Sequence, residues 1–199
     1  MRVISGRFKG VALTTPKAGT RPTTDRTKEA IFSHLDSWGV LDDARVLDLF
    51  AGTGALGIEA LSRGARELVA VESSAPAALI AQTLTALKHN RSWEHGMSAR
   101  VVKARAEKYA ASASAVEPFD MVFIDPPYAF ETNDCNQLLA DLASRELTSS
   151  NTVIMLERST RSEAPTAPAN WEITDRRDYG ETAVYYIEPS EPISDNGQQ

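Results

Sequence analysis

Apolar and polar positions alternate in short blocks through the middle of the chain, and these blocks predict strands and helices in turn. The strand-like runs cover 45–50, 67–71, 100–102, 119–124 and 152–156, and the helix-like segments cover 55–63, 75–88 and 136–144. Repeated strand-then-helix units form a parallel sheet with right-handed crossovers and helices on both faces. Two later runs, at 171–176 and 182–188, are joined by Tyr179-Gly180 and predict an antiparallel hairpin.

The first forty residues have a different pattern. Two short β-prone runs, at 3–5 and 11–14, are separated by glycines and predict a small hairpin. A helix capped by Thr24 or Asp25 is expected to run to about Trp38. The last residues are polar and acidic, and we expect them to be disordered. The chain is therefore divided into an N-terminal extension, a main domain and a tail, at 1–40, 41–188 and 189–199.

Composition narrows the class of protein. A chain of 199 residues, 42% apolar and 24% charged, suits one soluble globular domain with a small appendage. It has neither an apolar run long enough to cross a bilayer nor the apolar core of a signal peptide. A single cysteine, Cys135, excludes an internal disulfide, so we expect a cytoplasmic protein without membrane contact. The histidines show no metal-ligand spacing, and no metal is expected.

Charge is distributed unevenly along the chain. Residues 1–30 hold seven basic and two acidic side chains, whereas the rest holds 14 basic and 25 acidic ones, for a net charge of −6. A local basic field of this kind indicates a partner that carries phosphates. A solvated arm without a partner would show the same pattern, and charge alone leaves both readings open.

A glycine-rich turn follows the first strand of the alternating region. Gly52, Gly54 and Gly57 fit the spacing G-x-G-x-x-G, which lets the backbone approach a ligand closely. Asp48 in the strand before them would repel a pyrophosphate but suits a cationic amino group. Glu72 at the end of the next strand can accept hydrogen bonds from a ribose diol. Together they favour S-adenosylmethionine over a dinucleotide, unless Asp48 only caps the turn and Glu72 is simply exposed.

The stretch FIDPPY, at 123–128, is a buried strand stopped by two prolines. An exocyclic purine amine is a poor nucleophile, because its lone pair is delocalised into the ring. The Asp125 carboxylate and the Pro126 carbonyl can accept its N–H groups, and the pair Pro126 and Pro127 keeps both acceptors rigid. Tyr128 would stack on a base swung out of its own stack, a contact of about 1–3 kcal/mol. The alternative is a structural turn, with Asp125 as a cap and Tyr128 in a minor core.

These motifs carry a family resemblance. AGTGALGIEALSRGA followed by VAVES resembles the cofactor-binding half of class I methyltransferases, and VFIDPPY resembles motif IV of the amino-methyltransferases. RVISGRFKG and TRPTTDRTKEAIFSHL are similar to the bacterial 16S ribosomal RNA guanine-N2 methyltransferases of the RsmD family. The resemblance runs from about Arg2 to Tyr186. It implies a Rossmann-like α/β fold with a mostly parallel seven-stranded sheet, a C-terminal antiparallel hairpin and a small N-terminal hairpin and helix.

The resemblance also implies roles for particular residues. The catalytic residues would be Asp125, Pro126, Pro127 and Tyr128. Those binding S-adenosylmethionine would be Asp48, Phe50, Ala51, Gly52, Thr53, Gly54, Glu72, Ser73, Arg105, Ala106 and Asp125. Those contacting RNA would be Arg7, Lys9, Arg21, Thr23, Arg26 and Lys28. Arg105 departs from the family pattern, which has a small polar residue at this position.

The implied activity is methylation of the exocyclic N2 amine of a guanine in 16S rRNA. The implied partner is that rRNA within a 30S subunit or assembly intermediate, and the implied state is a monomer. Two other functions stay open: an N-methyltransferase acting on DNA adenine N6 or on a protein glutamine, and a non-catalytic RNA-binding protein of ribosome assembly. DNA enzymes usually add a target-recognition insert, for which the short gaps between strands leave no room.

Overall fold

The computed structural model describes residues 1–14 and 24–190. The predictions for Arg21, Thr23 and most of the C-terminal tail lie outside these residues. Within them, no helix is long and apolar enough to cross a membrane.

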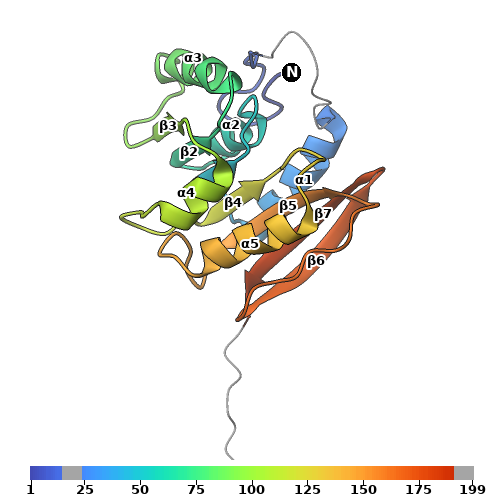
Figure 1. Cartoon of the computed structure of the whole chain (residues 1–199). Helices are drawn as coiled ribbons and strands as arrows, with labels where there is room; N and C mark the ends of the chain where they lie inside the picture. The colour runs from blue at the N-terminus through green and yellow to red at the C-terminus, as the bar shows by residue number, and fades with distance from the viewer. Residues whose placement is uncertain (15–23, 191–199) are drawn as a thin grey trace, which may run out of the picture.

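A seven-stranded sheet forms the centre of the molecule (Figure 1). Its strands are β1 (Arg45–Leu49), β2 (Glu67–Val71), β3 (Ser98–Val102), β4 (Met121–Ile124), β5 (Val153–Ser159), β6 (Trp171–Tyr179) and β7 (Thr182–Pro189). The order across the sheet is β3-β2-β1-β4-β5-β7-β6. The first five strands pair in parallel, and β7 pairs antiparallel with both β5 and β6. The mostly parallel sheet and the C-terminal hairpin are confirmed.

Helices cover both faces of this sheet (Figure 1). They are α1 (Asp25–Trp38), α2 (Ala55–Ser62), α3 (Pro76–Lys88), α4 (Ala106–Ser112) and α5 (Thr132–Ala143). One apolar core joins α1, α2 and α3 to the sheet, and a second joins α4 and α5 to its other face. The short β1 and β4 are buried along their whole length, as parallel strands between two helical layers must be.

The structure corrects several predicted boundaries. The helix α4 was missed, because seven residues are too few for a clear helical period, although Ala106, Tyr109 and Ala110 have helical spacing and are buried. β5 runs on to Ser159, since β7 supplies a partner as far as the pair Ser159 and Thr182. β7 includes Pro189, so the predicted tail begins inside a strand.

The predicted N-terminal hairpin is short: Arg2 and Ala12 form an antiparallel bridge, and Val3 N donates to Val11 O at 2.9 Å, but neither arm is long enough to form a regular strand. It lies along α2, where Arg7 N donates to Ser62 O at 2.8 Å. A Cβ atom at Gly6, where φ is +80°, would lie 1.9 Å from the same carbonyl oxygen, so only glycine permits this approach. Phe8 is buried in the core that α1 and α2 share. The extension therefore packs as part of the main domain's core.

The helix α1 begins and ends as the sequence predicts. Thr24 caps it, because its Oγ1 accepts a hydrogen bond from Thr27 N at 3.2 Å. Gly39, with φ of +67°, ends it. Ile31 and Leu35 are fully buried, as the apolar face requires.

Candidate cofactor and catalytic site

The carboxyl edge of the sheet brings the two sequence motifs together. Leu49 at the end of β1 pairs with Ile124 at the end of β4, so the glycine-rich turn and the Asp-Pro-Pro-Tyr turn start side by side. On its other side β1 pairs with β2 through Leu49 and Val71, and Glu72 follows directly. Ligands of open α/β sheets bind beyond this edge.

The glycine-rich turn is tightly wound. Phe50, Gly52 and Gly54 all have positive φ, of 58°, 56° and 76°. Left-handed backbone is strained for the bulky Phe50, which is a reason to suspect function at this turn. Gly57, on the first turn of α2, serves packing instead: a Cβ there would lie 2.4 Å from Leu68 Cδ1 and 3.0 Å from Asp48 Oδ2.

Asp48 is a buried carboxylate, and among the described residues its side chain accepts one hydrogen bond, from Gly57 N at 2.9 Å. Burial raises its pKa to about 7, and the nearby charges of Asp125 and Glu72 push it in the same direction. Asp125 keeps some exposed surface, yet burial of its carboxyl raises its pKa to about 6. Within the part of the chain that the structure describes, no lysine or arginine forms an ion pair with these three carboxylates.

Glu72 is held against the glycine-rich turn. Its Oε2 accepts from Gly52 N at 2.9 Å, and its Oε1 accepts from the N–H and hydroxyl of Ser74. The reading of Glu72 as simply exposed is therefore wrong, because it is half-buried and bonded to the turn. Ser73 beside it is exposed. A carboxylate has about four acceptor sites, so Glu72 retains room for a ligand hydroxyl.

The Asp-Pro-Pro-Tyr turn is closed by a hydrogen bond from Phe130 N to Pro127 O, at 2.8 Å. The ring of Phe130 meets that of Phe50 edge-on, with centroids 5.0 Å apart. The two motifs thus touch through these rings, a contact that sequence reasoning missed because nothing in the spacing pairs the two positions. Tyr128 is 76% exposed, which excludes the reading that places it in a minor core.

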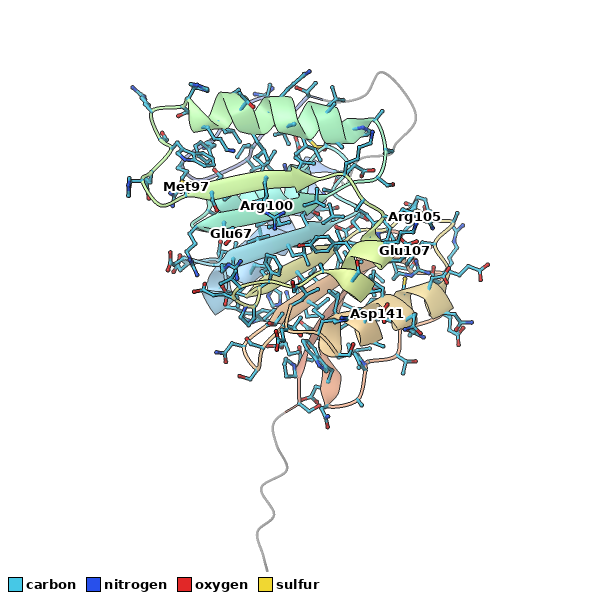
Figure 2. The ribbon with its side chains drawn as sticks, turned by 60° about the vertical axis from the view of Figure 1, so that its left-hand side comes forward. Glu67, Met97, Arg100, Arg105, Glu107 and Asp141 are labelled. Carbon is cyan, nitrogen blue, oxygen red and sulfur yellow. The ribbon has the colours of Figure 1, made fainter. Side chains whose placement is uncertain are left out.

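Arg105 and Ala106 follow β3 at the same edge. Ala106 is buried at the start of α4. Arg105 is exposed, and its Nη2 donates to Glu107 Oε1 at 2.8 Å. The two residues lie close together beyond the end of β3 (Figure 2). This ion pair raises the pKa of Arg105 and gives its side chain a partner on its own surface.

The basic residues that were predicted to contact RNA differ in exposure and in their partners within the protein. Lys28 is a correction: its side chain is buried, with Nζ 3.0 Å from Arg2 O and 3.4 Å from Glu59 Oε2, so it cannot reach a phosphate. Arg7 pairs with Glu94 at 2.8 Å and donates to Met97 Sδ. Met97 precedes β3 at the end of that strand opposite to Arg105 (Figure 2).

Exposed basic side chains remain at Lys9 and Arg26. α1 ends near the amino edge of the sheet, where Gly39 lines a hollow beside Asp120, so its first turn with Arg26 points toward the carboxyl edge. The extension also borders the cofactor turn, since Thr53 Oγ1 lies 3.7 Å from Met1 Sδ.

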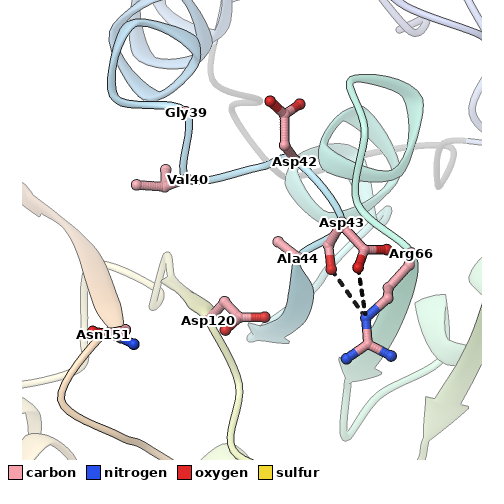
Figure 3. Close-up of a pocket in the computed structure, with 8 residues that line it drawn as sticks. All are labelled: Gly39, Val40, Asp42, Asp43, Ala44, Arg66, Asp120 and Asn151. Atoms are coloured by element: carbon pink, nitrogen blue, oxygen red, sulfur yellow. Dashed lines mark hydrogen bonds and ion pairs between the residues drawn. The ribbon is translucent and has the colours of Figure 1, made fainter.

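The hollow at the amino edge, shown in Figure 3, has a volume of about 390 Å³ and is lined by residues that lie before or at the starts of strands, whereas the two motifs follow the strand ends. Its polar groups are largely used by the protein. Arg66 contacts Asp43, and Asp120 Oδ2 accepts from Arg45 N at 2.8 Å. This hollow contains none of the predicted site residues.

Comparison with known proteins agrees with this architecture. The family model described as Conserved hypothetical protein 95 matches residues 1–188. Ribosomal RNA small subunit methyltransferase D of Escherichia coli (strain K12) is 34% identical over 185 residues, which are 92% of this chain and 87% of that protein. The solved Escherichia coli protein yhhF has a TM-score of 0.80 at 32% identity, covering 96% of this chain and 98% of that one.

A more distant structure shares the fold alone. Magnesium protoporphyrin IX methyltransferase from Synechocystis, solved with bound SAM, is 14% identical, with a TM-score of 0.61 over 86% of this chain and 87% of its own. The sheet order, the glycine-rich turn and these likenesses define a class I methyltransferase. Within that class the chain belongs to the family described as Conserved hypothetical protein 95, the RsmD family.

Proposed function

We propose that this protein transfers the methyl group of S-adenosylmethionine to the exocyclic N2 amine of a guanine in 16S rRNA. The observation that carries the proposal is the convergence of Asp48, Glu72 and Asp125 at the carboxyl edge of β1, β2 and β4. Buried carboxylates without a cationic partner are costly, and they persist where a ligand or a reaction uses them.

The residues at this edge fit the cofactor. S-adenosylmethionine carries an ammonium and a sulfonium, and Asp48 with its raised pKa gains a favourable charge partner when either lies near it. Glu72 would accept the ribose hydroxyls, and the backbone of Gly52 to Gly54 leaves the ligand room. Phe50, Ala51, Thr53, Ser73 and Ala106 would complete its surroundings.

When bound, the cofactor supplies an electrophilic methyl carbon next to the Asp-Pro-Pro-Tyr turn. The Asp125 carboxylate and the Pro126 carbonyl accept the two N–H groups of the amine, which aims its lone pair out of the ring plane. Asp125 is the stronger acceptor when it is ionised, and it then also stabilises the positive charge that develops on the amine; its pKa of about 6 keeps it mostly ionised at neutral pH. Tyr128 offers an exposed ring on which the target base stacks.

The substrate is inferred from the relatives. Methyltransferase D of Escherichia coli is named for small-subunit ribosomal RNA, and this chain covers 87% of it. The exposed Arg26, near the carboxyl edge, supports a partner with phosphates close to the site. We further propose guanine N2 as the methylated atom. The alternative acceptors are adenine N6 of DNA and the side-chain amide of a protein glutamine.

The test uses tritiated S-adenosylmethionine with unmodified 30S particles, naked 16S rRNA, duplex DNA and protein in parallel. We expect label in the 30S RNA, recovered as N2-methylguanine after digestion. Label in DNA or protein and none in RNA would overturn the substrate, and label on another nucleoside would overturn the position. Calorimetry without any heat of S-adenosylmethionine binding would favour the non-catalytic reading.

A further inference from the structure

Arg158 lies near the end of β5 and connects the sheet to the segment that closes the Asp-Pro-Pro-Tyr turn. Its Nη1 donates to Phe130 O at 2.7 Å, and its Nη2 donates to Thr132 Oγ1 at 3.3 Å. Phe130 ends the turn, and Thr132 is the first residue of α5. One side chain therefore holds both the turn and the helix that follows it.

The burial of Arg158 makes this arrangement unusual. The residue is 8% exposed, and its Nε makes no hydrogen bond within the described residues. A buried guanidinium is costly to keep, and its charge-assisted bonds are strong. The bonds to Phe130 O and Thr132 Oγ1 both go to the segment 130–132, so they fix the position of that segment.

Phe130 is the point where the two motifs of the site meet. Its N–H is bonded to Pro127 O, its carbonyl to Arg158, and its ring contacts that of Phe50 in the glycine-rich turn. A shift of Phe130 therefore changes the angle between the turn that carries Asp125 and the turn that would bind the cofactor.

The base of this connection is rigid. β5 pairs with β4 through Leu156 and Ile124, the residue before Asp125, and Arg158 itself pairs with Ala183 in β7. The backbone of Arg158 is thus fixed within the sheet, and its guanidinium reaches Phe130, which closes the Asp-Pro-Pro-Tyr turn. The hydroxyl of Thr132 also donates a hydrogen bond to Glu163 O at 3.3 Å, which links the start of α5 to the loop after β5.

We propose that Arg158 is a positioning residue for methyl transfer, which fixes the Asp-Pro-Pro-Tyr turn relative to the cofactor turn by holding Phe130 and Thr132 from the sheet. The inference rests on the proposed function for its kinetic consequence but not for its structural one. Lysine cannot replace the arginine, because an ammonium lacks the planar pair of N–H donors that reaches both oxygens.

Arg45 offers a matched control at the opposite edge of the sheet. It is also 8% exposed, lies on a strand, and donates to the backbone carbonyls of Glu117 and Pro118. Arg158→Met and Arg45→Met therefore both remove a buried guanidinium that holds a loop. Only the first of these loops belongs to the candidate site.

The kinetic test compares these variants at a temperature at which all are folded. We expect Arg158→Met to lower kcat by about tenfold to a hundredfold, with KM for S-adenosylmethionine changed by less than about threefold. Arg158→Lys should fall in between, and Arg45→Met should keep the wild-type kcat. Thr132→Val should have a smaller effect than Arg158→Met, and the double variant should lose less than the two effects multiplied. Equal falls in kcat for Arg158→Met and Arg45→Met would overturn the proposal.

A second measurement does not depend on activity. Hydrogen exchange of the Phe130 amide, which is bonded within the turn, should be at least about tenfold faster in Arg158→Met and unchanged in Arg45→Met. Unchanged exchange in Arg158→Met would refute the positioning role. Accelerated exchange with no methyl transfer by the wild type to any acceptor would refute the proposed function and leave the positioning of the turn intact.

Discussion

The amino and carboxyl edges of the sheet both carry acidic side chains, but these side chains have different partners. At the amino edge, two glutamates are paired with arginines: Arg45 bonds Glu67 at 2.6 Å, and Arg66 bonds Glu117 at 3.1 Å. At the carboxyl edge, Asp48 and its two neighbouring carboxylates have no cationic partner in the described chain. The glutamates at the amino edge are therefore neutralised by arginines of the same chain, whereas the carboxylates at the carboxyl edge remain available to a cationic ligand.

The two kinds of carboxylate are expected to differ in how they affect ligand binding and the stability of the fold. A carboxylate that is already paired with an arginine gains little from an added cation, because its charge is compensated within the protein. A buried, unpaired carboxylate costs stability while no ligand is present and binds a cation more strongly when one arrives. The aspartates that line the amino-edge hollow in Figure 3 are exposed or half-buried, so none of them matches the buried, unpaired Asp48.

The largest expected effect contrasts one aspartate from each edge. Asp125→Ala removes an acceptor from the catalytic turn, so we expect kcat to fall by at least about a thousandfold, with affinity for S-adenosylmethionine within about tenfold of wild type. Asp120→Ala removes the acceptor of Arg45 N, and should cost about 1–3 kcal/mol of unfolding free energy without lowering kcat. Methyl transfer by the first variant at the wild-type rate would remove Asp125 from its role.

Asp48→Asn should have opposite effects on binding and on stability. Loss of the carboxylate should weaken S-adenosylmethionine binding by about a hundredfold in calorimetry. The ligand-free variant, however, no longer buries a charge, so its unfolding free energy at pH 8 should exceed that of the wild type. A variant that binds the cofactor normally would show that Asp48 serves only to cap Gly57.

The stability of the ligand-free wild type should depend on pH for the same reason. The folded protein holds the Asp48 proton up to about pH 7, whereas an unfolded aspartate loses it near 4. The folded state therefore binds more protons in this window, and the unfolding free energy should fall as pH rises through it. Asp48 contributes at most about 1.4 kcal/mol per pH unit, and Asp125, whose pKa is raised to about 6, adds to the slope at the lower end of the window. Urea unfolding between pH 5 and 8 measures the slope, and Asp48→Asn should reduce it.

Affinity for the cationic cofactor should run the other way. Binding favours the ionised carboxylates, so the dissociation constant of S-adenosylmethionine should fall by about tenfold as pH rises from 6 to 8. The same titration with Glu67→Gln, at the paired edge, should keep the wild-type slope. Affinity that does not change with pH would show that the raised pKa values do not take part in binding.

Much of this arrangement follows from local sequence. The blocks that predict β1, β2 and β4 also place Asp48, Glu72 and Asp125 at strand ends, because parallel strands end at a common edge. The order of strands and helices was predictable for the same reason. The exceptions are the short helix α4, which was missed, and the strand β5, which is longer than predicted. What the sequence shows is the order of elements and the chemistry carried by each turn.

The rest depends on contacts between distant positions. Phe50 and Phe130 meet only because β1 and β4 are neighbours, and Arg158 reaches Phe130 across 28 positions of the chain. Lys28 was misread because it lies on the helix face that packs on Glu59, where a charged residue is rare unless paired. Local patterns indicate amphipathic faces, but they do not identify a buried ion pair.

The smallest expected effect separates two basic residues of α1. Arg26 is exposed on its first turn, whereas Lys28 is buried against Glu59. If RNA approaches the carboxyl edge, Arg26→Ala should lower the slope of log binding constant against log salt by about one, because one phosphate contact is lost. Lys28→Met should leave this slope unchanged but destabilise the protein, since Glu59 loses a buried cation. Filter binding with 16S rRNA fragments over a salt series measures both slopes. A change of slope for Lys28→Met alone would mean that the extension repacks on RNA and exposes the lysine, and that the basic residues act through rearrangement rather than from their positions in the free protein.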